Sequence, residues 1–365
     1  MYAFTPNGKV RWAVDVGSLV HSCKQLDRYG ITATPVADPE RGVLYVGDAF
    51  GLLHALDLAT GRERPGWPVE VFRWYWHDHI WGALTLIGDS VYVAAGAYCD
   101  QLMEGKLARV SVTTRQVDTW VSVPLGLGGG GGIWGWGGIA YSTARNSLYV
   151  VTGNAFDGGE NTGDAFREYA GFGEHLVELS TELGVRASSH PGDILARHDL
   201  DFTGSPVVFT RPGCGELVAA ANKNGRLYLW RGSAVDEGPI GEVTIRAASP
   251  SRPLLTQPAY SPRLRSIYVV TNVSLVRVAV DAECRPRSVW AVPLRTRSLN
   301  GSPTVSGGTV WFATSGESPR LFGVDARTGA VRARLRLGTL TLVAPTVFEG
   351  RIYVGSFFGH VYAFR

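Results

Sequence analysis

Short strand-like segments recur along the whole chain and constrain its fold more than any other feature. Residues 44–47 (LYVG) and 52–57 (LLHALD) are two strand-like runs, each followed by turn residues. Six further copies follow at residues 91–93, 148–150, 217–219, 267–269, 310–312 and 352–354, spaced 47, 57, 69, 50, 43 and 42 residues apart. All-strand units at this period are typical of a β-propeller, because small sheets that cannot bury both faces alone can do so by stacking radially.

The spacing predicts one all-β domain over residues 1–365, a propeller of four-stranded antiparallel blades. We predict seven blades, at residues 31–69, 79–121, 133–188, 200–246, 254–291, 300–337 and 343–365; the alternative is eight blades with an incomplete first one. Residues 1–4 (MYAF) echo residues 361–364 (VYAF), so we expect a leader and two strands of a further blade upstream. The last unit shows only three strands. We expect residues 9–12 to supply its fourth, because closure removes an exposed edge.

Composition narrows the classes of partner. A formal net charge of +3 gives no reason to expect a nucleic-acid partner. No apolar run approaches the roughly 20 residues that a membrane span needs. Only four of the 35 basic residues are lysines, and Arg332, Arg334 and Arg336 alternate with apolar residues on an outer strand. We interpret these arginines as protection of an exposed edge, with a polyanion site as the alternative.

The four cysteines are isolated, without the CxxC spacing of zinc sites. They suit disulfides in an extracytoplasmic protein, periplasmic or secreted, although four cysteines allow three pairings. We predict Cys23 with Cys99 and Cys214 with Cys284, because each pair falls in neighbouring units.

A turn motif carries a family resemblance. The run Asp57-x-x-Thr60-Gly61 returns as residues 325–329, and Trp12, Trp120 and Trp290 stand at the ends of outer strands. Together these features resemble the tryptophan-docking repeat of the quinoprotein dehydrogenases, which are propellers that bind pyrroloquinoline quinone (PQQ). The same repeat occurs in non-catalytic relatives, including the lipoprotein scaffold of the outer-membrane barrel-assembly machinery. The repeat therefore predicts the fold and leaves the function open.

A more specific resemblance to quinoprotein alcohol dehydrogenases covers residues 133–230. It rests on WGW at 134–136, LYVVTGN at 148–154, DLDFTG at 199–204 and NKNG at 222–225. The resemblance implies that Asn154 and Asp201 ligate calcium and that Asp201 takes the proton of the alcohol. It also implies that Lys223 contacts the quinone oxygens and that the cofactor lies on Trp134 or Trp136. These roles suit the residue types, since calcium prefers oxygen ligands and a flat cofactor suits an indole face.

Three places in the sequence bear on the expected cofactor and metal. At two of them the chain differs from dehydrogenases of this family, and at the third the members of the family differ from one another. The adjacent cysteines that cover the cofactor are absent near residues 48–49, and Asp100 or Glu104 would replace the glutamate metal ligand expected near residues 96–100. Position 203 is Thr, where lanthanide-dependent relatives have a second carboxylate. Calcium is therefore the expected ion.

Residues 77–81 (HDHIW) form another candidate site. We interpret His79 and Trp81 as rim residues that contact a ligand at the mouth of the central channel; the alternative is a metal site using His77 and His79 at i and i+2 of an extended segment. The glycine motif at residues 126–131 is not a dinucleotide loop, because no helix follows it. Carboxylates around the channel also permit a glycoside hydrolase, with Asp78, Asp100, Glu174 and Asp201 as candidates.

Two functional hypotheses follow. The first is a dehydrogenase for alcohols, polyols or sugars that uses PQQ and calcium, with Asp201 as the base. The second is a non-catalytic extracytoplasmic propeller that binds a protein or a carbohydrate. Convergence of Asn154, Asp201 and Lys223 on one cavity would favour the first hypothesis.

Overall fold

The computed structural model describes residues 1–23, 26–73, 77–96, 103–156, 169–192, 194, 199–246, 256–294 and 299–365, with only the backbone described at residues 20–23 and 26–29. The chain divides into two compact units. Unit 1 comprises Met1–Glu174 and Glu178–Arg186, and unit 2 comprises His175–Val177 and Ala187–Arg365. Among the described residues, no helix is long and apolar enough to cross a membrane.

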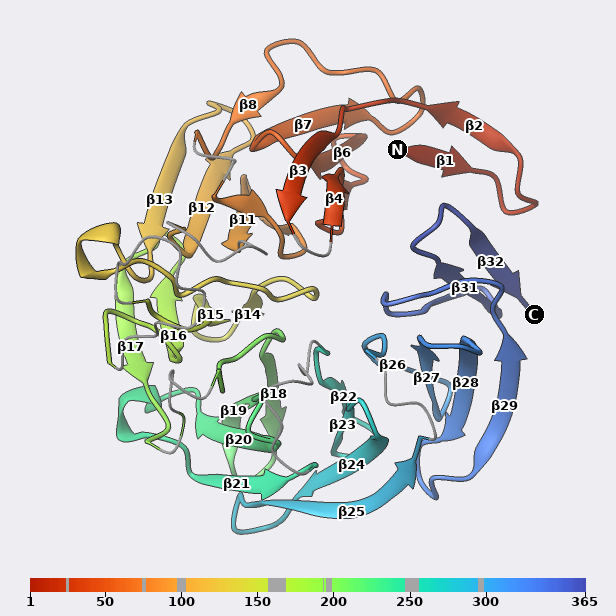
Figure 1. Cartoon of the computed structure of the whole chain (residues 1–365). Helices are drawn as coiled ribbons and strands as arrows, with labels where there is room; N and C mark the ends of the chain where they lie inside the picture. The colour runs from red at the N-terminus through yellow and green to blue at the C-terminus, as the bar shows by residue number, and fades with distance from the viewer. Residues whose placement is uncertain are drawn as a thin grey trace. The chain divides into compact units, whose positions relative to one another are not determined.

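The first half of the chain forms successive antiparallel sheets in chain order (Figure 1). Two hairpins come first, β1 (Tyr2–Phe4) with β2 (Val10–Ala13) and β3 (Leu19–Cys23) with β4 (Leu26–Tyr29). The next sheet contains β5 (Val36–Asp38), β6 (Val43–Gly47), β7 (Leu52–Asp57) and β8 (Val69–Glu70). It is followed by β10 (Thr85–Ile87), β11 (Ser90–Gly96), β12 (Lys106–Ser111) and β13 (Val117–Val121), with β9 (His79–Ile80) paired to β11 and the short 3-10 helix η1 (Leu125–Leu127) after β13.

The remaining sheets repeat the same order. The first of them contains β14 (Ala140–Ser142), β15 (Ser147–Val151), β16 (Leu176–Ser180) and β17 (Val185–Ser189). The second contains β18 (Val207–Arg211), β19 (Gly215–Ala221), β20 (Arg226–Arg231) and β21 (Gly241–Thr244), with the 3-10 helix η3 (Val235–Glu237) between β20 and β21. The third contains β22 (Ala259–Ser261), β23 (Ser266–Val270), β24 (Ser274–Val280) and β25 (Pro286–Pro293). The last two are β26 (Thr304–Ser306), β27 (Thr309–Thr314), β28 (Arg320–Asp325) and β29 (Val331–Arg336), then β30 (Thr346–Phe348), β31 (Arg351–Gly355) and β32 (Val361–Phe364).

Burial along the strands explains this arrangement. Every residue of the second strands β11, β15 and β23 is buried, as expected when other sheets cover both faces. The outer strand β29 instead alternates exposed arginines with half-buried apolar residues, as predicted for Arg332, Arg334 and Arg336. Apolar clusters fill the spaces between successive sheets, for example between β18–β21 and β22–β25 and between β22–β25 and β26–β29. Within unit 2, the first strands β18, β22, β26 and β30 are neighbours in that order. The described chain is therefore an all-β propeller of seven antiparallel blades, at the predicted positions.

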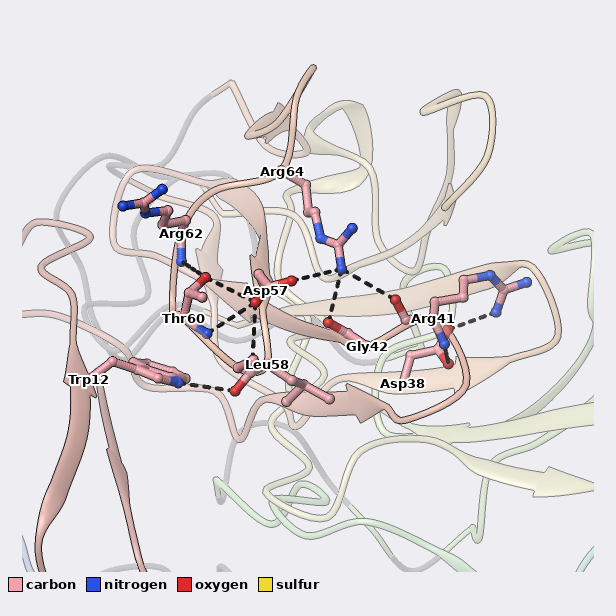
Figure 2. A network of polar contacts seen from close by, with 10 residues as sticks. Trp12, Asp38, Arg41, Gly42, Asp57, Leu58, Thr60, Arg62 and Arg64 are labelled. Atoms are coloured by element: carbon pink, nitrogen blue, oxygen red, sulfur yellow. Dashed lines mark hydrogen bonds and ion pairs between the residues drawn. The ribbon is translucent and has the colours of Figure 1, made fainter.

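Tryptophan docking joins separate sheets (Figure 2). The indole Nε1 of Trp12 in β2 donates to the carbonyl of Leu58 at 3.0 Å, and its ring covers Gly61 so closely that a Cβ there would lie 2.7 Å from it. Asp57 Oδ1 holds the turn by accepting from the backbone and hydroxyl of Thr60. The ring of Trp12 therefore occupies the space that a side chain at position 61 would need.

The same contact recurs in unit 2. Trp290 in β25 donates to the carbonyl of Arg327 at 3.0 Å and covers Gly329. Trp120 in β13 instead lies against Phe172, with 5.6 Å between the ring centroids. Two of the three predicted docking tryptophans thus contact the glycine of an Asp-x-x-Thr-Gly turn.

The described cysteines confirm one predicted disulfide. Cys214 and Cys284 are bonded, with 5.6 Å between their Cα atoms. They join the turn before β19 to the turn before β25, and therefore link neighbouring sheets of unit 2. The predicted Cys23–Cys99 pair lies outside the described side chains, and closure of the last sheet by residues 9–12 stays a prediction.

Candidate functional site

Unit 2 buries a lysine between two carboxylates. Asp201 lies in the segment before β18, and Lys223 lies in the turn between β19 and β20. The turn packs on that segment, because the backbone N–H of Lys223 donates to the carbonyl of Asp201 at 3.2 Å. Lys223 Nζ lies 2.6 Å from Asp201 Oδ1 and 2.7 Å from Asp199 Oδ1. Two residues predicted to share a site, Asp201 and Lys223, are therefore in direct contact.

Burial sets the proton affinities in this cluster. Asp201 is 3% exposed and Lys223 is 8% exposed. Burial raises the pKa of Asp201, and this effect outweighs the opposing attraction of Lys223. Burial lowers the pKa of Lys223, but the charges of Asp201 and Asp199 outweigh it and raise the pKa overall. Lys223 is thus a stable cation beside a carboxylate that binds a proton more readily than usual.

The turn that carries Lys223 is rigid. Asn222 Oδ1 accepts from the backbone of Asn224, whose Nδ2 donates to the Tyr228 hydroxyl at 2.6 Å. Arg246 Nη2 donates to the carbonyl of Lys223 at 2.9 Å. These residues therefore form a tight hairpin turn and fix the backbone of Lys223.

Unit 1 gathers three of the predicted tryptophans. The ring of Trp81 meets that of Trp134 edge-on, with 5.5 Å between centroids, and that of Trp136 edge-on at 6.5 Å. Trp136 Nε1 is buried without a hydrogen-bond partner. A Cβ on Gly96 or Gly132 would come within about 3.1 Å of the Trp134 ring, so a larger residue at either position would shift that indole by a few tenths of an ångström. Sequence reasoning assigned these tryptophans separately, and the structure brings them together.

Asn154 lies beside a carboxylate that sequence reasoning did not assign as a metal ligand. Asn154 is 7% exposed and follows β15, and the backbone of the next residue, Ala155, donates to Glu174 Oε1 at 3.0 Å. Glu174 is fully buried. The two side chains are 20 positions apart, across the insertion at residues 156–173, and no periodic pattern in the sequence connects them. The predicted substitute ligand Asp100 lies outside the described residues.

The segment at residues 77–81 differs from the prediction. Residues 77 and 78 form a turn and a bend, and β9 begins only at His79, so the extended segment assumed for a histidine pair is wrong. His79 is 4% exposed, and its contact with a ligand at a channel mouth stays a prediction.

Asp78, which lies between the two histidines, pairs with Lys106 and accepts from the backbone of Glu104 at 3.1 Å. Glu104 Oε2 lies 3.0 Å from the same lysine. Burial raises the pKa of Asp78 against the attraction of Lys106. Both candidate carboxylates are therefore engaged by Lys106.

The glycine-rich loop serves close packing. The backbone of Gly130 exchanges hydrogen bonds with Met103 and Gly105, and Gly131 donates to the carbonyl of Asn154 at 2.7 Å. A Cβ on Gly130 would lie 2.3 Å from that carbonyl oxygen. These glycines fix the backbone at Asn154, in agreement with the rejection of a dinucleotide loop.

The structure thus forms two groups of candidate residues. Trp81, Trp134 and Trp136 gather in unit 1, and Asp201 and Lys223 gather in unit 2. Within the described part of the chain, no three His, Cys, Asp or Glu side chains are close enough together to hold a metal ion. The convergence of Asn154 with Asp201 and Lys223 stays a prediction.

Comparisons with known proteins agree with this fold. Residues 274–365 match the family model described as outer membrane protein assembly factor BamB. Among solved structures, the chain is similar to quinohemoprotein alcohol dehydrogenase from Comamonas testosteroni, with a TM-score of 0.64 and 18% identity over 86% of this chain and 61% of that one. It is also similar to a europium-containing methanol dehydrogenase, with a TM-score of 0.64 and 15% identity over 90% of this chain and 71% of that one.

The chain is similar in the same way to BamB from Moraxella catarrhalis, with a TM-score of 0.61 and 14% identity over 97% of this chain and 85% of that one. The search of curated protein sequences found no match. By fold, the chain is similar to the PQQ-like β-propellers, and the family match is to residues 274–365. It spans about three fifths of the length of the two quinohemoprotein alcohol dehydrogenases that it resembles.

Proposed function

We propose that the protein is a quinoprotein dehydrogenase that oxidises an alcohol, a polyol or a sugar. The buried cluster of Asp201, Lys223 and Asp199 carries this proposal. Burying charged groups is costly, and a buried carboxylate with a raised pKa beside a fixed cation is typical of functional sites. The similarity to two dehydrogenase structures supports the same function.

The described residues suit the quinone. Lys223 offers an ammonium group to quinone or carboxylate oxygens, and Trp134 and Trp136 offer indole faces or edges to a flat ring. Asn154 and Glu174 supply oxygen atoms of the kind that calcium prefers. When bound, the quinone would accept the hydride of the substrate.

Asp201 would act as the base that takes the alcohol proton. Its raised pKa makes it a stronger base than an exposed aspartate, and Lys223 keeps a cation beside the carboxylate before the proton arrives. Asp199, the second partner of Lys223, would orient the ammonium group. Asp78, a candidate for the glycoside hydrolase alternative, pairs with Lys106 in unit 1.

Titration with PQQ and calcium tests the proposal. We expect quenching of tryptophan fluorescence at micromolar quinone and reduction of a dye with simple alcohols. Asp201→Asn should abolish dye reduction and retain quenching, whereas Lys223→Met should weaken quenching. Glu178→Gln is the matched control, because Glu178 is also a buried carboxylate held by a cation, Arg145, at 3.0 Å. Its dye reduction should match that of the native chain.

A protein-binding scaffold is the second candidate. The match of residues 274–365 to the BamB model favours it, as does the similarity to BamB over most of both chains. Absence of quenching at micromolar quinone with calcium would leave this candidate alone. Both candidates are consistent with an extracytoplasmic location, which the Cys214–Cys284 disulfide supports.

A further inference from the structure

A hollow of about 460 Å³ lies between two neighbouring sheets of unit 2. Three turns line it: the turn between β22 and β23, the turn between β26 and β27, and the turn between β28 and β29. Three arginines line the hollow, Arg263, Arg327 and Arg332, together with hydroxyl groups of Ser261, Ser306, Thr309 and Thr328. Its volume is within the range of small-molecule sites, about 300–1,000 Å³.

The hollow carries uncompensated positive charge. Its one carboxylate, Asp325, accepts hydrogen bonds from the backbone and hydroxyl of Thr328 and pairs with Arg332 at 3.2 Å. The hydrogen bonds from Thr328, followed by the one from Arg332, lower the pKa of Asp325 to about 2. Among the described residues, no carboxylate lies within ion-pair distance of Arg263 or Arg327. Two guanidinium groups therefore remain available to an anion.

The backbone that carries these arginines is held in place. The carbonyl of Arg327 accepts from Arg277 Nη1 at 2.8 Å and from Trp290 Nε1 at 3.0 Å. The N–H of Ala326 donates to the carbonyl of Gly308 in the facing turn at 2.9 Å. Hydrogen bonds fix the backbone of these turns before a ligand arrives. The conformational entropy lost on binding would therefore come only from the arginine side chains.

The corresponding turn of unit 1 provides an internal comparison (Figure 2). There Arg64 pairs with Asp57 at 2.9 Å, as Arg332 pairs with Asp325, and also donates to the carbonyl of Gly42. Ala59 occupies the position that Arg327 has in unit 2. Arg41, in the neighbouring turn, is held by Asp38 at 2.7 Å. The repeat itself therefore does not require unpaired arginines.

Charge is also distributed unevenly along the chain. Residues 187–365 contain 21 basic and 12 acidic residues, whereas residues 1–186 contain 14 and 20. The surplus positive charge of residues 187–365, the half of the chain that contains the hollow, would attract an anion before contact.

We propose that this hollow binds a phosphate group, either of a soluble phosphate ester or of a phospholipid headgroup. Arg263 and Arg327 are the binding residues, and Arg332 is positioned by Asp325. The dianion of a phosphate monoester matches two unpaired guanidinium groups and accepts further hydrogen bonds from the hydroxyl groups, and the phosphodiester of a phospholipid would use the same donors with one negative charge. This site is separate from the proposed quinone site and does not depend on it.

Binding of glycerol 3-phosphate and of inorganic phosphate to the whole chain, measured by calorimetry at low salt, tests the soluble source. Flotation with vesicles of phosphatidylglycerol, compared with phosphatidylcholine, tests the lipid source. Arg263→Ala and Arg327→Ala should each weaken binding about tenfold, because each removes a charge-assisted hydrogen bond. Both arginines are exposed, so the variants should fold, and circular dichroism checks this.

Two control variants make the test specific. Arg64→Ala changes the equivalent of Arg332 in unit 1, and Arg334→Ala removes an exposed arginine of β29 that does not line the hollow. Both should bind phosphate as the native chain does. An equal loss in Arg334→Ala would indicate a diffuse basic surface and overturn the proposal. No binding at millimolar phosphate together with no preference for phosphatidylglycerol would also overturn the proposal. Binding of poly-glutamate alone would overturn it as well, because it would indicate an acidic protein partner.

Discussion

Substitution of Gly61 by alanine tests the tryptophan docking that joins the first sheets. Gly61 has φ +72°, and a Cβ there would lie 2.7 Å from the ring of Trp12. The left-handed backbone costs a non-glycine residue roughly 1–2 kcal/mol. Overpacking against a ring that is held by its bond to Leu58 adds roughly 1–3 kcal/mol. We therefore expect Gly61→Ala to lower the free energy of unfolding by about 3 kcal/mol.

Gly88→Ala is the matched control. Gly88 also has a positive φ, +59°, and lies in a turn of unit 1, but a Cβ there would meet nothing within 4 Å. It should cost only the backbone contribution, roughly 1–2 kcal/mol. Urea unfolding followed by circular dichroism measures both variants. The difference between them isolates the contact with the indole.

A double-mutant cycle strengthens the test. In a Trp12→Ala background the ring is gone, so Gly61→Ala should cost no more than Gly88→Ala does, and the two substitutions should couple by about 1–3 kcal/mol. Equal effects of Gly61→Ala and Gly88→Ala, or strict additivity with Trp12→Ala, would refute the docking geometry.

Two further predictions concern single features of each unit. Burial lowers the pKa of His54, but the hydrogen bonds and charges of Asp48 and Glu63 outweigh it and raise the pKa overall. Because the pKa is higher in the folded state, protonated His54 stabilises the fold below the unfolded pKa of about 6.5. This stabilisation is lost as the pH rises through the folded pKa. Urea midpoints should therefore fall above neutral pH, and His54→Gln should flatten that trend. Replacing both Cys214 and Cys284 by serine opens a loop with a sequence separation of 70 residues, and should lower the unfolding free energy by about 4 kcal/mol; an unchanged urea midpoint would contradict this account.

The positions of the sheets could be predicted from the sequence, because each blade repeats local signals. An apolar second strand followed by a turn is sufficient to locate one sheet in the sequence. Neighbouring sheets can then stack, because each presents the same kind of apolar surface. The Cys214–Cys284 pairing followed from the same reasoning, since the two turns lie at the ends of adjacent blades. Local patterns therefore determine most of this architecture.

The candidate site was less accessible to sequence reasoning. The Asp201–Lys223 contact joins two segments of one blade, and the family motif covers both. Glu174 had no such signal, because its hydrogen bond with the backbone of Ala155 spans an insertion without periodicity. The sequence did not predict the burial of His79 either, because a two-residue strand pairs it with Gly96. Irregular connections between the strands determine where these residues lie, and no sequence pattern predicts those connections.

The docking contacts also assign a role to the first hairpin. Trp290 belongs to the fourth strand of its sheet and covers the turn glycine of the next sheet, Gly329. Trp12 makes the same contact from β2 with Gly61 in unit 1. We therefore predict that deleting residues 1–13 raises amide exchange in the turn at residues 57–61, because this turn loses the indole of Trp12, while β24 keeps its protection. Unchanged exchange in this turn would show that Trp12 does not stabilise it.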